Sequence, residues 1–570
     1  MATVSTLRLG PVVGHTDEES ARVWIRVRDG DDPVYYSLTV NGVGEFQFVS
    51  TETEVEFGTA IAVAQGLRAN HNYRYQVRRI GHALSGASGT FQTMPPPEYL
   101  NEASFVVVSC NSAETAGAWA MLRKFIDDTQ PRFLLMIGDQ IYADDVWASH
   151  LDGPSRERRQ LLAQIYQESW SRTDVSAVLA NIPCYMMWDD HEIRDGWGSF
   201  APDSRTLSER YPLGKPIHDK YTAFFRDARD VCWHFQMVNN PSPLTNVIPR
   251  PQPATATAAV GPPPYAAKTK PVQAMPFVFR CGRTAVVVAD GRGERDVWRE
   301  ESPILGATQW KFLSSVVDEL PADIDALIVV TPVPIVSGSP HGQAQLSAGS
   351  RTDDVSYFKD GDEEALKRMF AEEGSGVENL PALLLVMGSA AAGVPVNVGK
   401  GVLDSVDDAR DQWSHYFSRP EQERLLRLAA RARNVNRTEG SARGLLFVGG
   451  DLHSAGVFHI DISEPACSFE CLIASAISKT SPSKFPGLVG TLVDEDFEVA
   501  DGIHASLQYL VNEYNFGVVT VAPYGRSAHI TAHVAHTGFR SEVWGVRLKI
   551  EPRNTARRIG QARPGDGWLP

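Results

Sequence analysis

The first 95 residues alternate between apolar and polar positions with a period of two. In Ala21–Val27 every second residue is apolar, which places one face of the segment against a core. Val34–Val40 and Tyr73–Val77 alternate in the same way, and no helical stripe interrupts these segments. We therefore predict that residues 1–95 form a β-sandwich domain.

The end of this region carries two further signals. Leu67–Tyr75 resembles the corner that precedes a late strand in fibronectin-type-III sandwiches, so we expect the first domain to be fibronectin-III-like. Phe91–Pro97 contains three consecutive prolines, and such a stretch is typical of a stiff linker. A second domain should therefore begin near residue 100.

From Ser104 onward, short apolar runs alternate with longer segments of helical periodicity. The apolar runs, each expected to be a buried strand, are Ser104–Ser109, Phe133–Ile137, Tyr185–Trp188, Thr284–Ala289, Ala326–Val330 and Leu445–Val448. The expected helices are Ala116–Asp128, Arg156–Leu179, Thr308–Leu320 and Pro420–Arg433. This alternation predicts a layered α/β domain over residues 100–550, with short strands after Gly456 and mixed central sheets because some connections are short.

Three segments depart from this pattern. Residues 241–276 contain ten prolines, which favours a solvent-exposed insertion, or alternatively a lid over the functional site. Residues 551–570 read as a polar tail. Leu380–Gly399 is uncharged, but Pro381 and Pro395 would interrupt a spanning helix, so we expect a strand and a loop there and no transmembrane segment.

Composition narrows the classes of function. The chain has 570 residues, of which 43% are hydrophobic and 22% charged, as in folded globular proteins, so disorder throughout is excluded. The formal net charge of −15 repels a phosphate backbone, and we expect no nucleic-acid binding. A small anionic substrate remains compatible with this charge, because a site can be locally positive.

The spacing of the cysteines and the sequence of the N-terminus bear on the cellular compartment of the protein. Six cysteines are dispersed without a Cys-x-x-Cys pair, so neither a disulfide scaffold nor a structural zinc knot is expected. Residues 1–10 have no basic region followed by an apolar core, so we predict no signal peptide in this chain. The expected location is cytoplasmic, or secreted or periplasmic if the sequence is a mature form.

Four of the apolar runs end directly in polar clusters, which are Cys110-Asn111, Gly138–Asp144, Asp189–Glu192 and Gly449–Ser454. Carboxyl ends of strands in an α/β sheet converge on one crevice, so these clusters should meet. A single such cluster is usually a turn or a solvated loop. Four of them together would place several acids in one crevice, and multivalent cations are the simplest means of offsetting their repulsion. The sequence therefore predicts a metal centre.

These residues resemble a known family. Gly138-Asp139-x-x-Tyr142, Trp188-Asp189-Asp190-His191-Glu192 and Gly450-Asp451-x-His453 are similar to motifs of the metallophosphoesterase superfamily, and most of all to its alkaline phosphatase D (PhoD-like) family. Asp290–Arg295 resembles that family's Asp-x-Arg segment, and Trp413–Tyr416 its Trp-x-x-Tyr stretch. The order of a sandwich followed by a phosphatase domain also matches, so the resemblance covers nearly the whole chain.

The resemblance implies a role for each matching residue. Asp139 would bridge two metals, His191 would be the catalytic imidazole, and Arg292 would be catalytic as a clamp on the substrate phosphate. Asn111 and Arg292 are the expected substrate-binding residues. The metal ligands implied by the resemblance are Cys110, Asp139, Tyr142, Asp190, Asp451 and His453.

Two departures from the superfamily bear on the metals. Ser109-Cys110-Asn111 stands where the common site has Asp-x-His, and Thr331–Pro334 lacks the usual later histidine. Such a di- or trinuclear site would be poor in nitrogen and rich in oxygen. Thiolate, phenolate and imidazole suit iron, whereas carboxylates suit a hard cation. We favour Fe³⁺ with Ca²⁺, as the resemblance suggests, and Zn²⁺, Mn²⁺ and Mg²⁺ remain open.

The expected activity is metal-dependent hydrolysis of phosphomonoesters, phosphodiesters or both, with a metal-bound hydroxide attacking phosphorus in line. The substrate would be a small phosphate ester. Two alternatives remain: phospholipase-D-like cleavage of lipid phosphodiesters, and a non-catalytic binding protein with a vestigial metal site. The chain has no Gly-x-Ser-x-Gly elbow and no Walker loop, so a serine hydrolase and a nucleotide cofactor are not expected.

Overall fold

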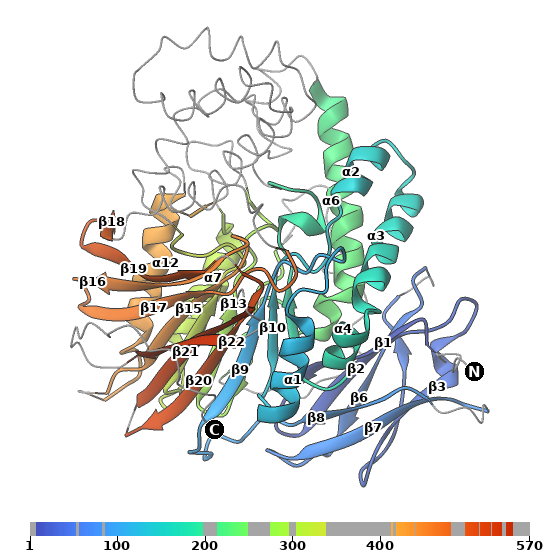
Figure 1. Cartoon of the computed structure of the whole chain (residues 1–570), viewed down its shortest axis with the longest axis horizontal. Helices are drawn as coiled ribbons and strands as arrows, with labels where there is room; N and C mark the ends of the chain where they lie inside the picture. Colours follow the sequence, from blue (N-terminus) through green and yellow to red (C-terminus); the bar gives the residue numbers. More distant parts are fainter. Residues whose placement is uncertain are drawn as a thin grey trace.

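The N-terminal region consists of two four-stranded antiparallel sheets (Figure 1). One has the order β1-β2-β6-β5 and the other β4-β3-β7-β8. The bounds are β1 Leu9–Thr16, β2 Ser20–Arg26, β3 Tyr36–Val40, β4 Gly44–Gln47, β5 Val49–Ser50, β6 Thr59–Gln65, β7 Asn72–Arg79 and β8 Ser88–Gln92, with a 3₁₀ turn at Pro33–Tyr35. The computed structural model describes residues 7–52, 56–81, 86–197, 214–248, 274–295, 304–337, 412–413, 418–438, 441–479, 496–511, 513–525, 527–537 and 543–550.

The alternation read from the sequence sets the faces of these strands. In β7 the side chains of Tyr73, Tyr75 and Val77 are buried, whereas the residues between them are exposed. They share one apolar cluster with Val23 and Ala62, which face each other across the β2–β6 pair. The two sheets therefore enclose a common core, as in a sandwich. The fibronectin-III-like class and the domain boundaries stay predictions.

The rest of the described chain is built on two mixed sheets, and the expected α/β class with mixed central sheets is confirmed. A six-stranded sheet has the order β11-β10-β9-β20-β21-β22, and an eight-stranded sheet has the order β12-β13-β14-β15-β17-β16-β19-β18. Their strands are β9 Ala103–Val108, β10 Leu134–Ile137, β11 Cys184–Met187, β12 Phe277–Cys281, β13 Thr284–Val288, β14 Ala326–Val330, β15 Gly444–Gly449, β16 Ala455–Ile462, β17 Cys467–Ile473, β18 Asp496–Ala500, β19 Ile503–Val511, β20 Asn515–Tyr524, β21 Ser527–Thr537 and β22 Val543–Ile550.

The side chains of one strand serve two different cores. Val286 and Val288 of β13 belong to the cluster shared with the six-stranded sheet, whereas Val287 belongs to a second cluster beneath two helices. Because successive side chains of a strand point to opposite faces, the two sheets pack on each other and helices cover the outer faces. The helices are α1 Trp119–Thr129, α2 Asp144–His150, α3 Ser155–Trp170, α4 Thr173–Leu179, α6 Gly214–Phe235, α7 Ala307–Asp318 and α12 Arg419–Ala432, with 3₁₀ turns at Asp190–Glu192 and Met237–Asn239.

Three features differ from the sequence expectation. The helix expected over Arg156–Leu179 is split, because the backbone of Arg172 is extended (φ −61°, ψ 138°) and begins α4. The helix α6 was not anticipated. After Gly456 the strands are not all short: β20 and β21 have 10 and 11 residues, and β20 pairs with β9. The final stretch of the chain thus completes the sheet with which the second region begins.

Several expectations fall outside the described residues. Most of the proline-rich segment, the strand expected within Leu380–Gly399 and the polar tail after residue 550 are among them. All six cysteines are described, and each is buried and outside any disulfide. Among the described helices, none combines the length and the apolar character that crossing a membrane requires.

The parallel strands direct their carboxyl ends to one region of the molecule. Strands β9, β10 and β11 are parallel in one sheet, and β13, β14, β15 and β17 are parallel in the other. In Figure 1 the loops that follow β9, β10 and β15 run toward the same side of the layered sheets. The polar clusters of the sequence lie on these loops.

Candidate metal centre

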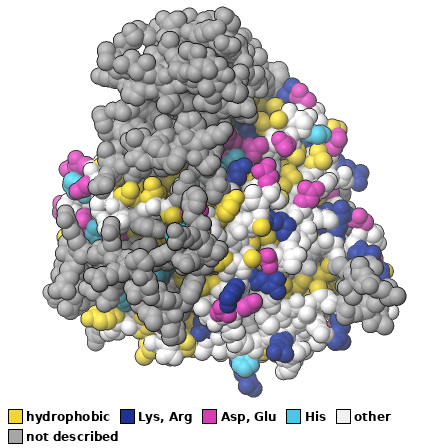
Figure 2. All heavy atoms as spheres, viewed as in Figure 1, with side chains coloured by type: hydrophobic (Ala, Val, Ile, Leu, Met, Phe, Trp, Pro, Cys, Tyr) yellow, Lys and Arg dark blue, Asp and Glu magenta, His cyan; other side chains and the backbone are white. Residues whose placement is uncertain are grey.

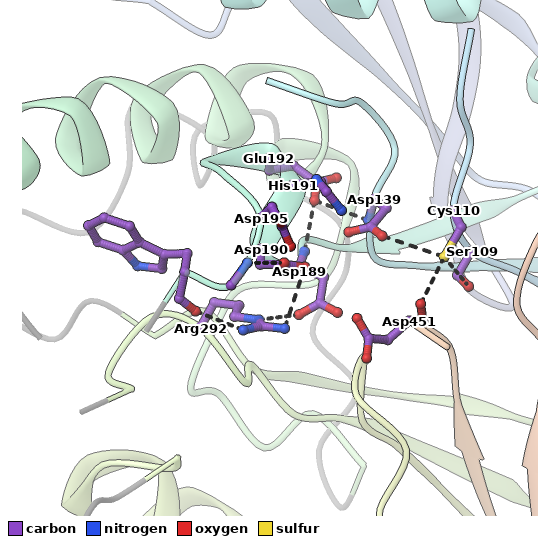
Figure 3. A network of polar contacts seen from close by, with 12 residues as sticks. Ser109, Cys110, Asp139, Asp189, Asp190, His191, Glu192, Asp195, Arg292 and Asp451 are labelled. Atoms are coloured by element: carbon purple, nitrogen blue, oxygen red, sulfur yellow. Dashed lines mark hydrogen bonds and ion pairs between the residues drawn. The ribbon is translucent and has the colours of Figure 1, made fainter. Parts of the chain in front are cut away.

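The four strand-end loops bring their acidic and sulfur side chains together, as the sequence predicted (Figure 3). Four of the residues involved have positive φ: Cys110 (57°), Asp139 (54°), Asp451 (66°) and His453 (53°). Side chains other than glycine seldom adopt this conformation, and local strain of this kind concentrates at functional sites. The loops after β9, β10 and β15 are therefore turned sharply close to the ends of their strands.

Gly138 allows the two neighbouring loops to come this close. A Cβ atom at this position would lie 2.6 Å from Cβ of Asp189, and φ at Gly138 is 98°. Its backbone N–H donates to the carbonyl of Met187 at 2.8 Å. Any larger residue at position 138 would push the loop after β10 away from the loop after β11.

The first candidate ligand group consists of Cys110, Asp139 and His453, whose ligand atoms all lie within 4.8 Å of one another. The Sγ atom of Cys110 is 3.4 Å from Oδ2 of Asp139 and 3.0 Å from the hydroxyl of Ser475. The hydroxyl of Tyr142 is 3.2 Å from Nε2 of His453. All four residues predicted for one metal therefore lie around the same point.

Two further groups extend the first. Asp139, Asp190 and His191 form the second group, and Asp189, Asp190 and Asp451 form the third, each with ligand atoms within 4.8 Å of one another. Asp139 is shared by the first two groups and Asp190 by the last two. Overlap of this kind is expected of adjacent metal positions that are bridged by carboxylates.

Burial makes the isolated acids energetically costly. Asp139 and Asp189 are buried, and burial raises the pKa of both carboxyls well above the usual range. The Cys110 thiol is also buried, which raises its pKa to about 11. Within the described part of the chain, Oδ1 of Asp139 and Oδ2 of Asp189 have no hydrogen-bond partner. Buried carboxylate oxygens without partners are costly unless a cation compensates them.

The set of donors fits metal ions. Cys110, His453 and Tyr142 offer sulfur, imidazole and phenol beside one carboxylate, a combination suited to a transition metal. The third group offers only carboxylate oxygens, which hard cations prefer. Burial, together with the neighbouring charges of His191 and Lys479, lowers the pKa of His453 to about 3, so this imidazole is neutral and can donate its lone pair.

His191 is held in place by a carboxylate that sequence reasoning did not single out. Its Nδ1 atom lies 2.8 Å from Oδ2 of Asp144, whose Oδ1 accepts a hydrogen bond from the backbone N–H of Asp195 at 2.7 Å. Burial alone would lower the pKa of His191, but Asp144, Asp190 and Asp139 together raise it well above its usual value. The spacing Asp139-x-x-x-x-Asp144 was the available signal.

Glu192 is a second residue whose role the sequence did not reveal. Its carboxylate accepts hydrogen bonds from the backbone N–H groups of Asp139 (3.1 Å), Gln140 (2.7 Å) and Asp189 (2.8 Å), and from Nε2 of Gln236 (2.8 Å). It thereby ties the loop after β10 to the loop after β11. Because these four bonds occupy the carboxylate, Glu192 supports the ligands and is not itself one of the candidate ligands.

Asp189 was overlooked as a ligand, although it belongs to the third group. The predicted motif contained two adjacent aspartates, and only Asp190 was assigned. In the structure Asp189 accepts a hydrogen bond from Nε of Arg292, while its other oxygen faces the centre (Figure 3). Two neighbouring carboxylates at the start of a 3₁₀ turn thus both reach the same site.

Arg292, the predicted phosphate clamp, pairs with two aspartates of the centre. Its side chain has no exposed surface, and it pairs with Asp189 and, at 3.4 Å, with Oδ1 of Asp190. Its NH1 group donates to the carbonyl of Trp197 at 2.7 Å. The guanidinium therefore neutralises and positions two candidate ligands, and its contact with a substrate phosphate stays a prediction.

Asn111 is likewise occupied within the protein. Its amide nitrogen donates to Ser169 at 2.8 Å, and its oxygen accepts from the indole of Trp119 at 2.9 Å. The side chain is fully buried. Its geometry fixes the loop after β9, and the predicted contact of Asn111 with substrate gains no support from it.

Comparisons with known proteins find similarity to one phosphatase family. A sequence model of the PhoD-like phosphatase family matches residues 105–223, the segment that contains Cys110, Asp139, Asp190 and His191. A solved structure of PhoD is similar over 99% of this chain and 94% of that chain, with a TM-score of 0.59 and 13% identity. The resemblance to the PhoD-like family is confirmed.

A second solved structure is a more distant neighbour of this chain. It is the purple acid phosphatase PPD1 isolated from yellow lupin (Lupinus luteus) seeds, at 9% identity and a TM-score of 0.47, covering 95% of this chain and 73% of that chain. No curated protein matches the chain. The likeness to PhoD supports the fold, and the activity of this chain is argued below from its own residues.

Proposed function

We propose that this protein is a metal-dependent phosphoesterase that hydrolyses phosphomonoesters, phosphodiesters or both. The observation that carries the proposal is the overlap of three ligand groups, in which Asp139 and Asp190 are each shared by two groups. Adjacent cations held by shared carboxylates suit the in-line displacement of a phosphate ester. The match to the PhoD-like phosphatase model supports the same reaction class.

The metals are proposed from the chemistry of the donors. The group of Cys110, Asp139 and His453, with Tyr142 beside it, suits iron, and the all-carboxylate group suits calcium. Zinc, manganese and magnesium are the alternatives. When bound, such cations polarise the phosphoryl oxygens and lower the pKa of water toward neutrality, which provides a nucleophile at working pH.

The chain's own residues supply the remaining functions. Asp144 holds His191 through Nδ1, and His191 lies in the second group together with Asp139 and Asp190, where the imidazole can hold or donate a proton to the leaving oxygen. Arg292 fixes the two aspartates of the loop after β11, and Glu192 fixes the backbone of both adjoining loops. His191 is thus the proposed catalytic residue, with Asp144 and Arg292 in positioning roles.

The proposal is tested by hydrolysis of a chromogenic phosphomonoester and a chromogenic phosphodiester before and after treatment with a chelator. We expect turnover of at least one ester, its loss with the chelator, and its return with iron and calcium. Activity that a strong chelator leaves unchanged would contradict the proposal. Turnover of lipid phosphodiesters alone would favour the phospholipase-D-like alternative, and the absence of any turnover by metal-loaded protein would favour the binding protein.

A further inference from the structure

In the part of the chain that the structure describes, the arginine closest to the candidate ligands, Arg292, is buried in its ion pairs with Asp189 and Asp190. A phosphomonoester carries two negative charges near neutral pH, whereas a diester carries one. The residues around the centre are mostly acids. A cation at the rim of the centre would therefore affect the binding of a monoester more than that of a diester.

Lys479 is placed at that rim. It follows strand β17, whose carboxyl end points to the same region as β15, its parallel neighbour. Its Nζ atom lies 4.9 Å from the ring centroid of Tyr142, the hydroxyl of which is 3.2 Å from Nε2 of His453. Among the described residues, no carboxylate lies within ion-pair distance of this ammonium, so its charge is available to a ligand.

The backbone that carries Lys479 is firmly anchored. The N–H of Ser478 donates to the carbonyl of Cys110 at 3.3 Å, and the carbonyl of Ser478 accepts from the hydroxyl of Thr115 at 2.7 Å. The Ser478 hydroxyl donates to the carbonyl of Ser112 at 2.8 Å. The residue before Lys479 is thus fixed to the same loop that holds Cys110, and the position of the lysine is coupled to the first ligand group.

The side chains around the centre differ in their exposure to solvent, with a buried base and a partly exposed rim. Cys110 and Asp139 are buried, whereas Tyr142, His453 and Lys479 are each partly exposed. A ligand that reaches the buried carboxylates from this side passes the ammonium group. Attraction between opposite charges grows as water is excluded, so a single lysine in this position discriminates between substrates of different charge.

We propose that Lys479 binds the phosphoryl oxygens of the substrate and favours dianionic phosphomonoesters over phosphodiesters. The proposal deepens the phosphoesterase function and rests on it. Lys479 takes the part that the sequence assigned to Arg292. Its ammonium nitrogen lies over the Tyr142 ring at the end of a flexible four-carbon stem, so it can move toward a phosphoryl group without displacing the ligands beneath it.

The test compares Lys479→Gln and Lys479→Arg with the wild-type protein. The matched control is Lys124→Gln, which removes an exposed lysine of α1 that pairs with Asp128 at 2.6 Å. We expect Lys479→Gln to lower kcat/KM for p-nitrophenyl phosphate at least about tenfold more than for bis(p-nitrophenyl) phosphate, the loss expected for one charge contact to an oxyanion. Inhibition by orthophosphate should weaken in parallel. Lys479→Arg should restore part of the preference for the monoester, and Lys124→Gln should stay close to wild type.

Equal losses with both esters, or no loss with either, would overturn the proposal and leave Lys479 as a packing partner of Tyr142. A calorimetric titration of the metal-loaded proteins with orthophosphate separates this failure from failure of the proposed function. If the wild type hydrolyses neither ester but binds phosphate, and Lys479→Gln does not, the proposed activity fails and the Lys479 contact stands. If phosphate binds both proteins equally, the contact is absent.

Discussion

Asp139 is the residue on which the centre depends most directly, because its carboxylate belongs to two of the three ligand groups. We predict that Asp139→Asn lowers turnover by about a hundredfold or more while the fold survives. An amide keeps the size of the side chain but loses the charge that holds two cations together. Activity and metal content of the purified variant should fall together.

The matched control for this substitution is Asp145→Asn. Asp145 is an exposed residue of α2, close in sequence and outside the three ligand groups. It should retain nearly full activity and metal content. If Asp139→Asn keeps more than about a tenth of wild-type activity, Asp139 does not bridge metals, since loss of a bridging charge costs far more.

Tyr142 provides a spectroscopic prediction. Its hydroxyl lies beside His453 at the group that also contains Cys110. Burial, followed by the charges of Cys110 and Asp139, raises the pKa of this phenol well above its usual value. Ionisation of the phenol therefore requires a strongly Lewis-acidic metal ion bound to its oxygen. With ferric iron bound, phenolate and thiolate donors should produce a visible charge-transfer band, which Tyr142→Phe should shift or bleach.

The absorption spectrum and iron content of the wild type and of Tyr142→Phe test whether Tyr142 is an iron ligand. Chelation together with a reductant should remove colour and activity in parallel. A colourless, iron-free wild-type protein whose activity survives Tyr142→Phe would contradict the role of Tyr142 as a ligand. The first group would then hold zinc, manganese or another cation without a phenolate.

At the scale of elements, the loops after β10 and β11 act as one unit through Glu192. We predict that Glu192→Gln lowers metal affinity about ten- to a hundredfold, the usual effect of losing an outer support of metal ligands. The amide NH₂ group cannot accept the hydrogen bonds from backbone N–H groups that the carboxylate now accepts.

Titration of the metal-free variant with each metal measures this effect. The control is Glu168→Gln, which alters an exposed residue of α3. Unchanged affinity would show that the loops hold their positions without Glu192.

The contact between β1 and β11 provides a prediction about acid stability. Nδ1 of His15 lies 3.2 Å from the hydroxyl of Tyr185, and burial, with a smaller effect of Arg22, lowers the pKa of His15 from 6.5 to about 3. The folded state therefore binds this proton more weakly than the unfolded state. The stability associated with neutral His15 is present above about pH 6.5 and is lost as the pH falls toward about 3.

His15→Gln tests this linkage because glutamine can keep the hydrogen bond but does not titrate. Between about pH 7 and pH 4.5, the free energy of unfolding of the wild type should fall by about 2 to 3 kcal/mol more than that of the variant. Denaturant unfolding at the two pH values measures the difference. Equal losses in both proteins would mean that His15 is not the group whose protonation matters.

Much of this element-level arrangement follows from local sequence patterns. Apolar runs such as Ala326–Val330 match their strand within one residue because a buried strand must be apolar on both faces. The pairing of β20 with β9 could not be predicted, since it joins residues more than 400 positions apart and nothing local encodes it. For the same reason the sequence placed the ligand-bearing loops together but could not show that Glu192 supports them or that Arg292 is enclosed.

At the scale of the whole molecule, the N-terminal sandwich supports the sheet that carries the centre. Its Trp24 donates to the carbonyl of His234 at 2.8 Å, its Tyr75 donates to the carbonyl of Ala180 at 2.8 Å, and Tyr185 donates to the carbonyl of Thr16 at 3.0 Å. All three aromatic side chains are buried. The sandwich therefore contributes to the stability of the centre without contributing any candidate ligand.

The surface charge fits a small substrate better than a polymer of phosphates. Figure 2 shows acidic and basic side chains interspersed over the described part of one face, with no broad basic area on it. The net charge of −15 opposes the approach of an extended polyanion. Local attraction for a phosphate ester then depends on bound cations and on groups such as Lys479.

In the proposed function, the loops after four strands hold cations on which phosphate-ester hydrolysis depends. Its most direct test is a stepwise chelator titration in which metal per chain and hydrolysis of p-nitrophenyl phosphate and bis(p-nitrophenyl) phosphate are measured on the same samples. We predict at least two metal ions per chain at full activity, and loss of turnover in step with their removal. Full turnover of either ester by protein from which all metal has been removed would contradict it.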